Sequence, residues 1–360
     1  MRWLAILWLF CAPFMAAVTY SQSRLPDYPP VVPGQALHFP SDHGAHPDFR
    51  TEWWYVTGWL QTADGTPLGF QVTFFRSRPP LDQTNPSRFA PKELLFAHAA
   101  VSDPVLGKLQ DEQRAARAGF GLAEVAGNDT NVHIGAWSLQ RDSGGTYRSV
   151  VQAREFTLEL TLVPTQPLLL EGERGYSRKG PLAPQASYYY SQPQLKVSGA
   201  LTRHGKREVI KGTAWLDHEW SSAMLDEHAV GWDWIGINFD DGGALMAFQI
   251  RNKAGGKFWA GGTLRRADGS VVALPASAVD FSPRRLWRSP RTGTEYPVSM
   301  HIHASDLTLD LVPLMDDQEL DSRASTGAIY WEGAVTALHG ANRVGRGYLE
   351  LTGYFQRLGF

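Results

Sequence analysis

The chain has 360 residues and a formal net charge of −2; 43% of its residues are hydrophobic and 19% are charged. This balance supports a buried core and excludes a disordered chain, and it argues against nucleic acid as a partner because phosphate binding needs clustered Lys and Arg. The length indicates about two domains. Thirteen tryptophans favour broad apolar contact surfaces.

Residues 1–23 have the pattern of an export signal peptide. Arg2 begins an apolar run over residues 3–18, and small residues follow up to Ser23. The run is shorter than the roughly 20 residues that span a membrane, although an uncleaved anchor is the alternative. The only cysteine, Cys11, lies in this segment, so the mature chain would have no disulfide, thiolate nucleophile or Cys-based zinc site. We therefore expect an exported protein that is periplasmic or envelope-associated.

After this segment, residues 24–50 are rich in Pro, His and Asp without periodicity, and we expect an extended lead-in. From residue 52 onward the pattern is that of β-strands. Segments 53–62 and 69–77 alternate in polarity and are joined through ADGTP, a hairpin signature. After a long loop at 78–93, further strands are expected over residues 94–102, 146–164, 188–203 and 207–220. The sequence DEQRAARAG (111–119) predicts the one helix of this half.

The second half begins much as the first half does. Residues 231–251 can be laid over 52–76, since each has an acidic and aromatic strand, an Asp-Gly turn, and then GFQV or AFQI. The halves also end alike, in GTAWLDHEW and GRGYLELTGY. Short strands at this spacing favour β-barrels or sandwiches. We interpret the chain as a diverged duplication, with domains at 51–222 and 229–358.

Acidic residues recur beside tryptophan. In TEWWY, strand alternation places Glu52 and Trp54 on one face, and Trp53 and Tyr55 on the other. A carboxyl in apolar surroundings has a raised pKa and can act as an acid. Protonation of an alkene needs such an acid, and aromatic faces can stabilise the resulting cation. Alternatively, Glu52 pairs with an arginine or a backbone amide and closes the end of the barrel.

The segment DHEW carries the densest cluster of polar groups. Asp217 and Glu219 are expected to face one way, and His218 and Trp220 the other. A histidine beside an aromatic ring could relay a proton, because its charge changes near neutral pH. The alternative is a structural hydrogen-bond network between the two domains.

Other clusters carry weaker signals. DHGAH (42–46) and HIH (301–303) each supply two histidines, but further ligands cannot be identified, so no metal is expected. The chain has no G-x-S-x-G elbow of a serine hydrolase. In YYYS, Tyr188 and Tyr190 share a face and would either pack in a barrel or contact a ligand.

The chain resembles the CrtC/AttH-like proteins, a lipocalin-like family with carotenoid 1,2-hydratase-type members, in several segments that occur in the same order: HFPSDHGAHPDFRTEWWYVTGWL, YYYSQPQLKVSG, GTAWLDHEW, GWDWIGINFDDG, and YWEGAV with GRGYLELTGY. The resemblance covers about residues 38–355. It implies an all-β fold of two consecutive lipocalin-like (calycin) antiparallel β-barrel or sandwich domains with few short helices, and a ligand region where they meet. The best-described reaction of the family adds water to an isolated alkene of an acyclic carotenoid, whereas fungal relatives guide pericyclic cyclisations and many bacterial members have no established reaction. One departure is Met300, at a position where a tryptophan is expected in this family.

The resemblance also suggests site residues. His218 and Trp220 match a His-x-Trp element, and Asp233 in GWDW is the nearest match to a catalytic aspartate. We expect Glu52, His218 and Asp233 to act as catalytic groups on one apolar cavity, without a cofactor. The residues expected to bind the ligand are Trp53, Trp54, Tyr55, Tyr188, Tyr190, Asp217, Glu219, Trp220, Trp232, Trp234, Trp331 and Glu332.

More than one function remains open. The protein could bind a hydrophobic lipid or isoprenoid ligand in an aromatic and acidic pocket and hydrate an alkene by general acid catalysis, as a hydro-lyase similar to carotenoid 1,2-hydratase. It could instead be a non-enzymatic lipid carrier or an accessory component of an ABC-type envelope export system, with a membrane ABC transporter as its partner. A purely structural envelope module is a third interpretation.

Overall fold

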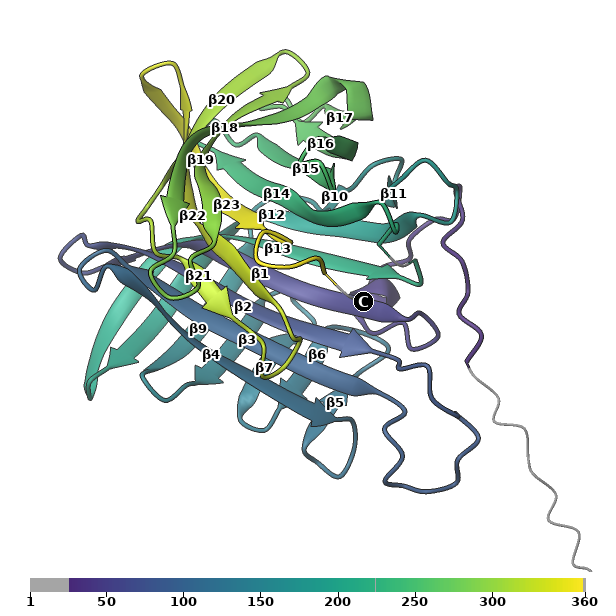
Figure 1. Cartoon of the computed structure of the whole chain (residues 1–360). Coiled ribbons are helices and arrows are strands. Elements are labelled where there is room, and N and C mark those ends of the chain that lie inside the picture. Colours follow the sequence, from purple (N-terminus) through teal and green to yellow (C-terminus); the bar gives the residue numbers. More distant parts are fainter. Residues whose placement is uncertain (1–25, 224, 359–360) are drawn as a thin grey trace, which may run out of the picture.

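The computed structural model describes residues 26–223 and 225–358, which form two antiparallel β-sheets that lie against each other (Figure 1). The expected signal segment, residues 1–23, lies outside the described residues. Two 3-10 helices occur in the described part of the chain, η1 (Ser41–His43) and η2 (Ala276–Ala278). None of its helices has the length and apolarity needed to cross a membrane. The all-β fold class expected from the sequence is confirmed.

Among the described residues, thirteen strands form the first sheet. These are β1 (Thr51–Thr62), β2 (Pro67–Ser77), β3 (Leu94–Asp103), β4 (Lys108–Arg117), β5 (Ala123–Val125), β6 (Asn131–Ile134), β7 (Trp137–Arg141), β8 (Tyr147–Gln152), β9 (Phe156–Pro164), β10 (Leu169–Leu170), β11 (Tyr176–Arg178), β12 (Ala186–Arg203) and β13 (Lys206–Ser221). Their order is β4-β3-β2-β1-β13-β12-β9-β8-β7-β6-β5, while β10 and β11 pair with β12.

Ten strands of the same described part form the second sheet. These are β14 (Ala229–Phe239), β15 (Ala244–Asn252), β16 (Lys257–Arg265), β17 (Val271–Leu274), β18 (Val279–Arg288), β19 (Glu295–Ala304), β20 (Leu307–Pro313), β21 (Glu319–Asp321), β22 (Ile329–His339) and β23 (Asn342–Leu351). Their order is β17-β16-β15-β14-β23-β22-β20-β19-β18, and β21 pairs with β22. In both sheets the first strand pairs with the last, β1 with β13 and β14 with β23.

Strand alternation gives each sheet its own apolar core. In the first sheet, Trp54 of β1 and Phe74 of β2 are buried in a cluster to which β3, β9, β12 and β13 also contribute. In the second sheet, Ile235 of β14 and Trp331 of β22 belong to a separate cluster. Burial of such large side chains stabilises the fold by about 1.5–3 kcal/mol each.

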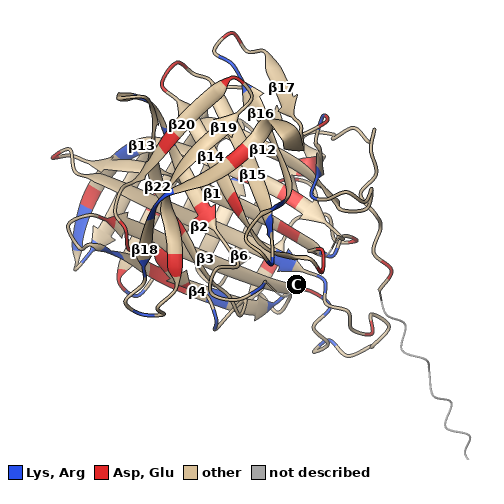
Figure 2. Cartoon of the chain, turned by 45° about the horizontal axis from the view of Figure 1, so that its top comes forward, with Lys and Arg blue, Asp and Glu red and all other residues tan. Residues whose placement is uncertain are grey.

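A third apolar layer joins the two sheets. It contains Tyr55, Trp59, Tyr189, Trp215, Trp234, Met246, Phe248 and Tyr348. The outer faces of β1 and β13 therefore pack against β14 and β23, so these central strands are covered on both faces. This explains why aromatic residues occupy consecutive positions in β1. Figure 2 shows acidic and basic residues dispersed over both sheets, without a continuous basic face in this view.

The prediction of a helix over residues 111–119 is wrong. Most of this segment lies in β4, which pairs with β3 along its whole length. The second sheet also holds it, because the Leu109 amide donates to the Asp317 carbonyl oxygen at 3.0 Å and Gln113 Nε2 donates to the Asp321 carbonyl oxygen at 2.7 Å. Pairing with neighbouring strands overrides the local helix propensity. Residues 26–50 form no strand, and η1 lies among them.

Gly212 of β13 has no room for a side chain, because a Cβ there would lie 1.9 Å from the Trp59 carbonyl oxygen on β1. We expect Gly212→Ala to lower the free energy of unfolding by about 1–3 kcal/mol, since the two strands must shift to accept the methyl group. Gly127→Ala is the matched control, as its nearest neighbouring atom, the Ala45 carbonyl oxygen, is 3.8 Å away. Denaturant unfolding measures both variants. Equal stability of the two would contradict the close approach of β1 and β13.

Candidate functional site

Glu52 lies inside the first sheet and is fully buried. Its Oε2 accepts a hydrogen bond from Arg76 Nε at 2.8 Å, while Oε1 lies 2.8 Å from His218 Nε2 and 2.7 Å from His46 Nδ1. Burial alone would raise the pKa of Glu52, but the hydrogen bonds with His218 and His46 and the nearby positive charges outweigh it and hold the pKa well below its usual range. Glu52 is therefore a stable carboxylate paired with an arginine, rather than an acid with a raised pKa.

His218 extends this network toward the lead-in. Its Nδ1 lies 3.1 Å from the Tyr190 hydroxyl, which lies 2.7 Å from His43 Nδ1. Burial lowers the pKa of His218. Trp220, two residues further along β13, stacks on His46 with ring centroids 3.7 Å apart. The His-x-Trp element thus points into the first sheet and away from the second.

Three potential metal-ligand atoms come within 4.8 Å of one another in the described part of the chain, on His46, Glu52 and His218. The two histidines already form direct hydrogen bonds with Glu52, and Arg76 brings a positive charge to the same carboxylate. A cation bound here would meet the repulsion of that arginine. The arrangement fits a hydrogen-bonded network better than a metal centre.

Asp233 lies inside the second sheet instead. Its Oδ1 accepts hydrogen bonds from Arg251 Nε at 3.0 Å and from the Tyr354 hydroxyl at 2.9 Å. Burial raises the pKa of Asp233 to about 6, although these two partners lower it. Asp233 shares no hydrogen bond or ion pair with Glu52 or His218, so the expected convergence of the three on one cavity is not found. The reason is strand alternation, because odd-numbered residues of β14 face the core of the second sheet.

A pocket of about 930 Å³ lies between the two sheets. Its aromatic wall consists of Trp53, Tyr55, Phe75, Phe96, Tyr189, Trp232, Trp234, Phe248 and Tyr330. The residues predicted from the sequence that line it are Glu52, Trp53, Tyr55, Asp217, Glu219, Trp232, Trp234 and Glu332. The predicted residues that point into the sheet cores instead are Trp54, Tyr188, Tyr190, Trp220 and Trp331.

Two carboxyls face each other in this wall. Glu332 of β22 and Glu350 of β23 are directly opposite in the strand register. The Tyr55 hydroxyl donates to Glu332 Oε2 at 2.6 Å, and Trp232 Nε1 donates to Glu350 Oε1 at 3.2 Å. Burial raises the pKa of Glu332 to about 8, and burial together with the adjacent Glu332 raises the pKa of Glu350 well above its usual value. The pair therefore retains a proton at neutral pH.

A second pair of carboxyls lies beside the pocket. Ser191 Oγ is 2.5 Å from Asp217 Oδ1 and 2.8 Å from Glu171 Oε1, and its single hydrogen can serve only one of them at a time. Burial raises the pKa of Asp217 to about 7 and that of Glu171 to about 8. Because Asp217 lines the pocket, a second protonatable group is present there near neutral pH.

Sequence reasoning missed Glu350, His98 and Lys179, which also line or border this pocket. Glu350 belongs to the segment GRGYLELTGY, which the sequence marked as acidic and aromatic, but only the pairing of β22 with β23 places it opposite Glu332. Lys179 Nζ lies 2.9 Å from Glu219 Oε1. His98 and Lys179 stand in no motif, and tertiary packing alone brings them to the pocket.

His98 joins the two sheets at the pocket. Its Nδ1 lies 2.7 Å from the Tyr330 hydroxyl and its Nε2 lies 2.8 Å from Ser325 Oγ. Burial lowers the pKa of His98 from 6.5 to about 3. Because the folded state prefers the neutral ring, this contribution to stability is complete above pH 6.5 and is lost as the pH falls toward 3.

We expect His98→Gln to make the free energy of unfolding less dependent on pH. On acidification from about pH 6 to about pH 4, the wild type should lose up to about 1.4 kcal/mol per pH unit more than the variant. Denaturant unfolding at several pH values measures this difference. His228→Gln, which changes an exposed histidine, is the control. Parallel curves for wild type and His98→Gln would show that the ring is not held neutral.

The AttH-like family model matches residues 30–354 of the chain. Among solved structures, a protein described as an AttH from Nitrosomonas europaea is 55% identical in sequence, with a TM-score of 0.86 over 91% of this chain and 99% of that one. No curated protein matches the sequence.

Two more distant structures share the fold. Kievitone hydratase from Nectria haematococca is 16% identical, with a TM-score of 0.68 over 92% of this chain and 99% of that one. CghA with Sch210972 is 15% identical, with a TM-score of 0.53 over 86% of this chain and 90% of that one. The architecture is thus the lipocalin-like fold of the CrtC/AttH type, and the chain belongs to the AttH-like family.

Proposed function

We propose that the protein binds a hydrophobic lipid or isoprenoid in the pocket between its two sheets and adds water to an alkene of that ligand. The observation that carries this proposal is the opposed pair Glu332 and Glu350. Two carboxyls that share a buried wall hold a proton at neutral pH, and a proton held beside an apolar cavity is a general acid.

The pocket walls suit such a ligand. A volume of about 930 Å³ falls within the roughly 300–1,000 Å³ of pockets that enclose small molecules. Aromatic side chains from both sheets supply apolar contact, and their faces would stabilise a developing carbocation. The ion pair between Lys179 and Glu219 neutralises a further charge of the wall, which favours an uncharged ligand.

In the proposed reaction, the O–H bond of the protonated carboxyl breaks and the proton forms a C–H bond with one alkene carbon. Water attacks the carbocation left on the other carbon, and the proton that the water loses returns to the carboxylate. The net change is alkene plus water to alcohol, without oxidation or reduction. Glu332 is the better donor of the pair, because Tyr55 holds its Oε2 while Oε1 has no hydrogen-bond partner among the described residues.

The relatives support the fold and leave the reaction and the ligand open. Kievitone hydratase bears the name of a hydratase and shares the fold with this chain, and at 16% identity the likeness extends to the fold alone. A lipid carrier that serves an envelope export system would use the same pocket without chemistry. Turnover, not binding, separates the two functions.

We expect Glu332→Gln and Glu350→Gln to reduce hydration by a factor of about 10²–10⁴ while ligand is still retained, because each change removes one member of the acid pair. The measurement uses lycopene, an acyclic carotenoid alkene, in heavy water, where the alcohol product carries deuterium on the protonated carbon. Native mass spectrometry of the purified protein reports the ligand that it retains. Glu295→Gln is the control, since this glutamate is exposed on β19 and does not line the pocket.

The pH dependence provides a second readout of the same reaction. The acid must be protonated, so turnover should fall as the pH rises through about 8, the pKa of Glu332. Retained ligand with no deuterated alcohol for any tested alkene would favour the carrier. Wild-type turnover in both glutamine variants would remove the carboxyl pair from the mechanism.

We further propose that the protein is exported, on the basis of the signal-like pattern in residues 1–23. The mature N-terminus should then follow this segment. Expression of the full chain in a bacterial host and N-terminal sequencing of the purified product test this. A product that still begins at Met1 would contradict export with cleavage.

A further inference from the structure

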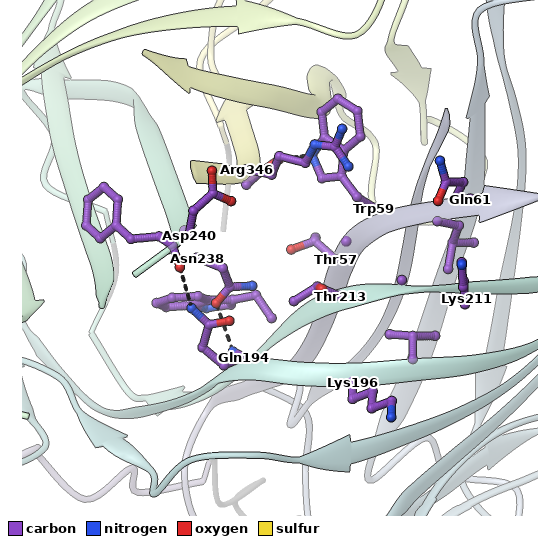
Figure 3. Close-up of a pocket in the computed structure, with 18 of the residues that line it drawn as sticks. Thr57, Trp59, Gln61, Gln194, Lys196, Lys211, Thr213, Asn238, Asp240 and Arg346 are labelled. Carbon is purple, nitrogen blue, oxygen red and sulfur yellow. Dashed lines mark hydrogen bonds between the residues drawn. The ribbon is translucent and has the colours of Figure 1, made fainter. Parts of the chain in front are cut away.

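A second pocket, of about 490 Å³, lies between the same two sheets at the other end of the interface (Figure 3). Along β1, Trp53 and Tyr55 line the first pocket, whereas Thr57 and Trp59 line the second. The two pockets differ in charge. Among the described residues, six acidic and four Lys or Arg side chains line the first pocket, whereas the second is lined by Asp240 and by Lys196, Lys211, Arg343 and Arg346.

Strand register places two lysines on the floor of this pocket. Lys196 of β12 is the cross-strand neighbour of Thr213 on β13, and Thr213 is the neighbour of Trp59 on β1. Lys211 precedes Thr213 by two positions and lies on the same face. Diagonal neighbours on a sheet are about 7–8 Å apart, so the two lysines occupy neighbouring positions on this face. Figure 3 shows Lys211 beside Gln61, with Lys196 on the adjacent strand.

The second sheet adds two arginines. The Arg346 guanidinium lies over the Trp59 ring, 4.6 Å from its centroid. Burial and the neighbouring Arg343 lower the pKa of Arg346. Arg343 pairs with Asp240 at 3.0 Å, so the acidic residue of the lining is already engaged. Neither Arg346 nor the two lysines form an ion pair with a residue of the described chain.

The lining also contains a polar group without a partner. Thr57 Oγ1 is buried and has no hydrogen-bond partner among the described residues. Figure 3 shows the Thr57 side chain turned toward the pocket. Nearby, Gln194 adopts a left-handed φ of 56° at the point where the pairing of β12 with β13 is irregular. The backbone N–H of Gln194 donates a hydrogen bond to Asn238 Oδ1 at 2.8 Å. A strained backbone held in place by its neighbours is often part of a functional site.

We propose that this second pocket binds a small molecule that carries a phosphate or carboxylate group. An anion between Arg346 and the two lysines would form charge-assisted hydrogen bonds. The Thr57 hydroxyl would donate to the same molecule. The first pocket takes an apolar ligand beside a protonated acid, whereas the second offers unpaired cations, so the two sites bind different chemical classes and act independently.

The test is isothermal titration calorimetry of the full chain with inorganic phosphate and, separately, with citrate, at an ionic strength held constant with chloride. We expect one saturable site for at least one of the two probes. Lys211→Ala and Arg346→Gln should weaken binding by roughly ten- to hundredfold, because each removes a charged donor. Lys253→Ala, which changes an exposed lysine in the turn between β15 and β16, is the matched control and should bind as the wild type does.

The two probes separate the sources of the anion. Saturation by phosphate alone assigns a phosphorylated ligand, saturation by citrate alone assigns a carboxylate, and saturation by both assigns a general oxyanion site. Lys211 is exposed, so its variant keeps the fold, and thermal melting verifies this for each protein. The proposal is overturned if neither probe saturates, or if Lys253→Ala weakens binding as much as Lys211→Ala does. Alkene hydration is not expected to change in any of these variants.

Discussion

Tyr55 donates a hydrogen bond to Glu332 across the interface of the two sheets. The pocket and its buried carboxyls exist only because the two sheets pack together at this interface. The central strands β1 and β13 are covered on both faces, by the core of the first sheet on one side and by the second sheet on the other. Two polar networks therefore lie back to back on the same backbone. Glu52 and His218 bond to each other inside the first sheet, and Glu52 also borders the pocket that Asp217 lines from the other face.

The two faces give the same residue type opposite charge states. Inside the first sheet, Glu52 meets a guanidinium and two imidazoles, and this environment keeps it ionised. At the interface, Glu332 receives a hydrogen bond from a neutral phenol and faces another carboxyl, so burial dominates and the protonated form is favoured. For these two glutamates, the ionised one has a guanidinium within hydrogen-bond distance, whereas the protonated one is hydrogen-bonded to a neutral phenol.

Each sheet contains one acid–arginine pair in its opening hairpin. Glu52 pairs with Arg76 between β1 and β2, and Asp233 pairs with Arg251 between β14 and β15. This repetition explains why an acidic residue stands beside tryptophan in both TEWW and GWDW. It favours the structural interpretation of these two acids, since each is neutralised within its own sheet.

The sequence was sufficient for the fold class and for part of the site. Period-two alternation predicted that Trp53 and Tyr55 leave the face of Glu52, and that Asp217 and Glu219 share a face; the structure has both. Alternation could not predict which face meets the second sheet. The resemblance placed His218 and Asp233 at the ligand, and both side chains form their hydrogen bonds inside their own sheets instead. The position of Glu350 opposite Glu332 depends on the register between β22 and β23. The periodicity of a sequence does not determine the register between two strands. The structure of segment 111–119 could not be predicted for a similar reason. Its pairing with β3 and its hydrogen bonds to the second sheet, which the local sequence does not reveal, make it a strand.

The two-sided burial of β1 also has a consequence for how this protein can change over evolutionary time. Even-numbered positions such as Trp54 are constrained by the packing of the first sheet, whereas odd-numbered positions such as Trp53 line the pocket between the sheets. A replacement at an odd position can alter the shape of the cavity while the barrel wall beneath it is preserved. The scaffold itself persists at 16% sequence identity, so such replacements can accumulate one residue at a time without loss of the fold.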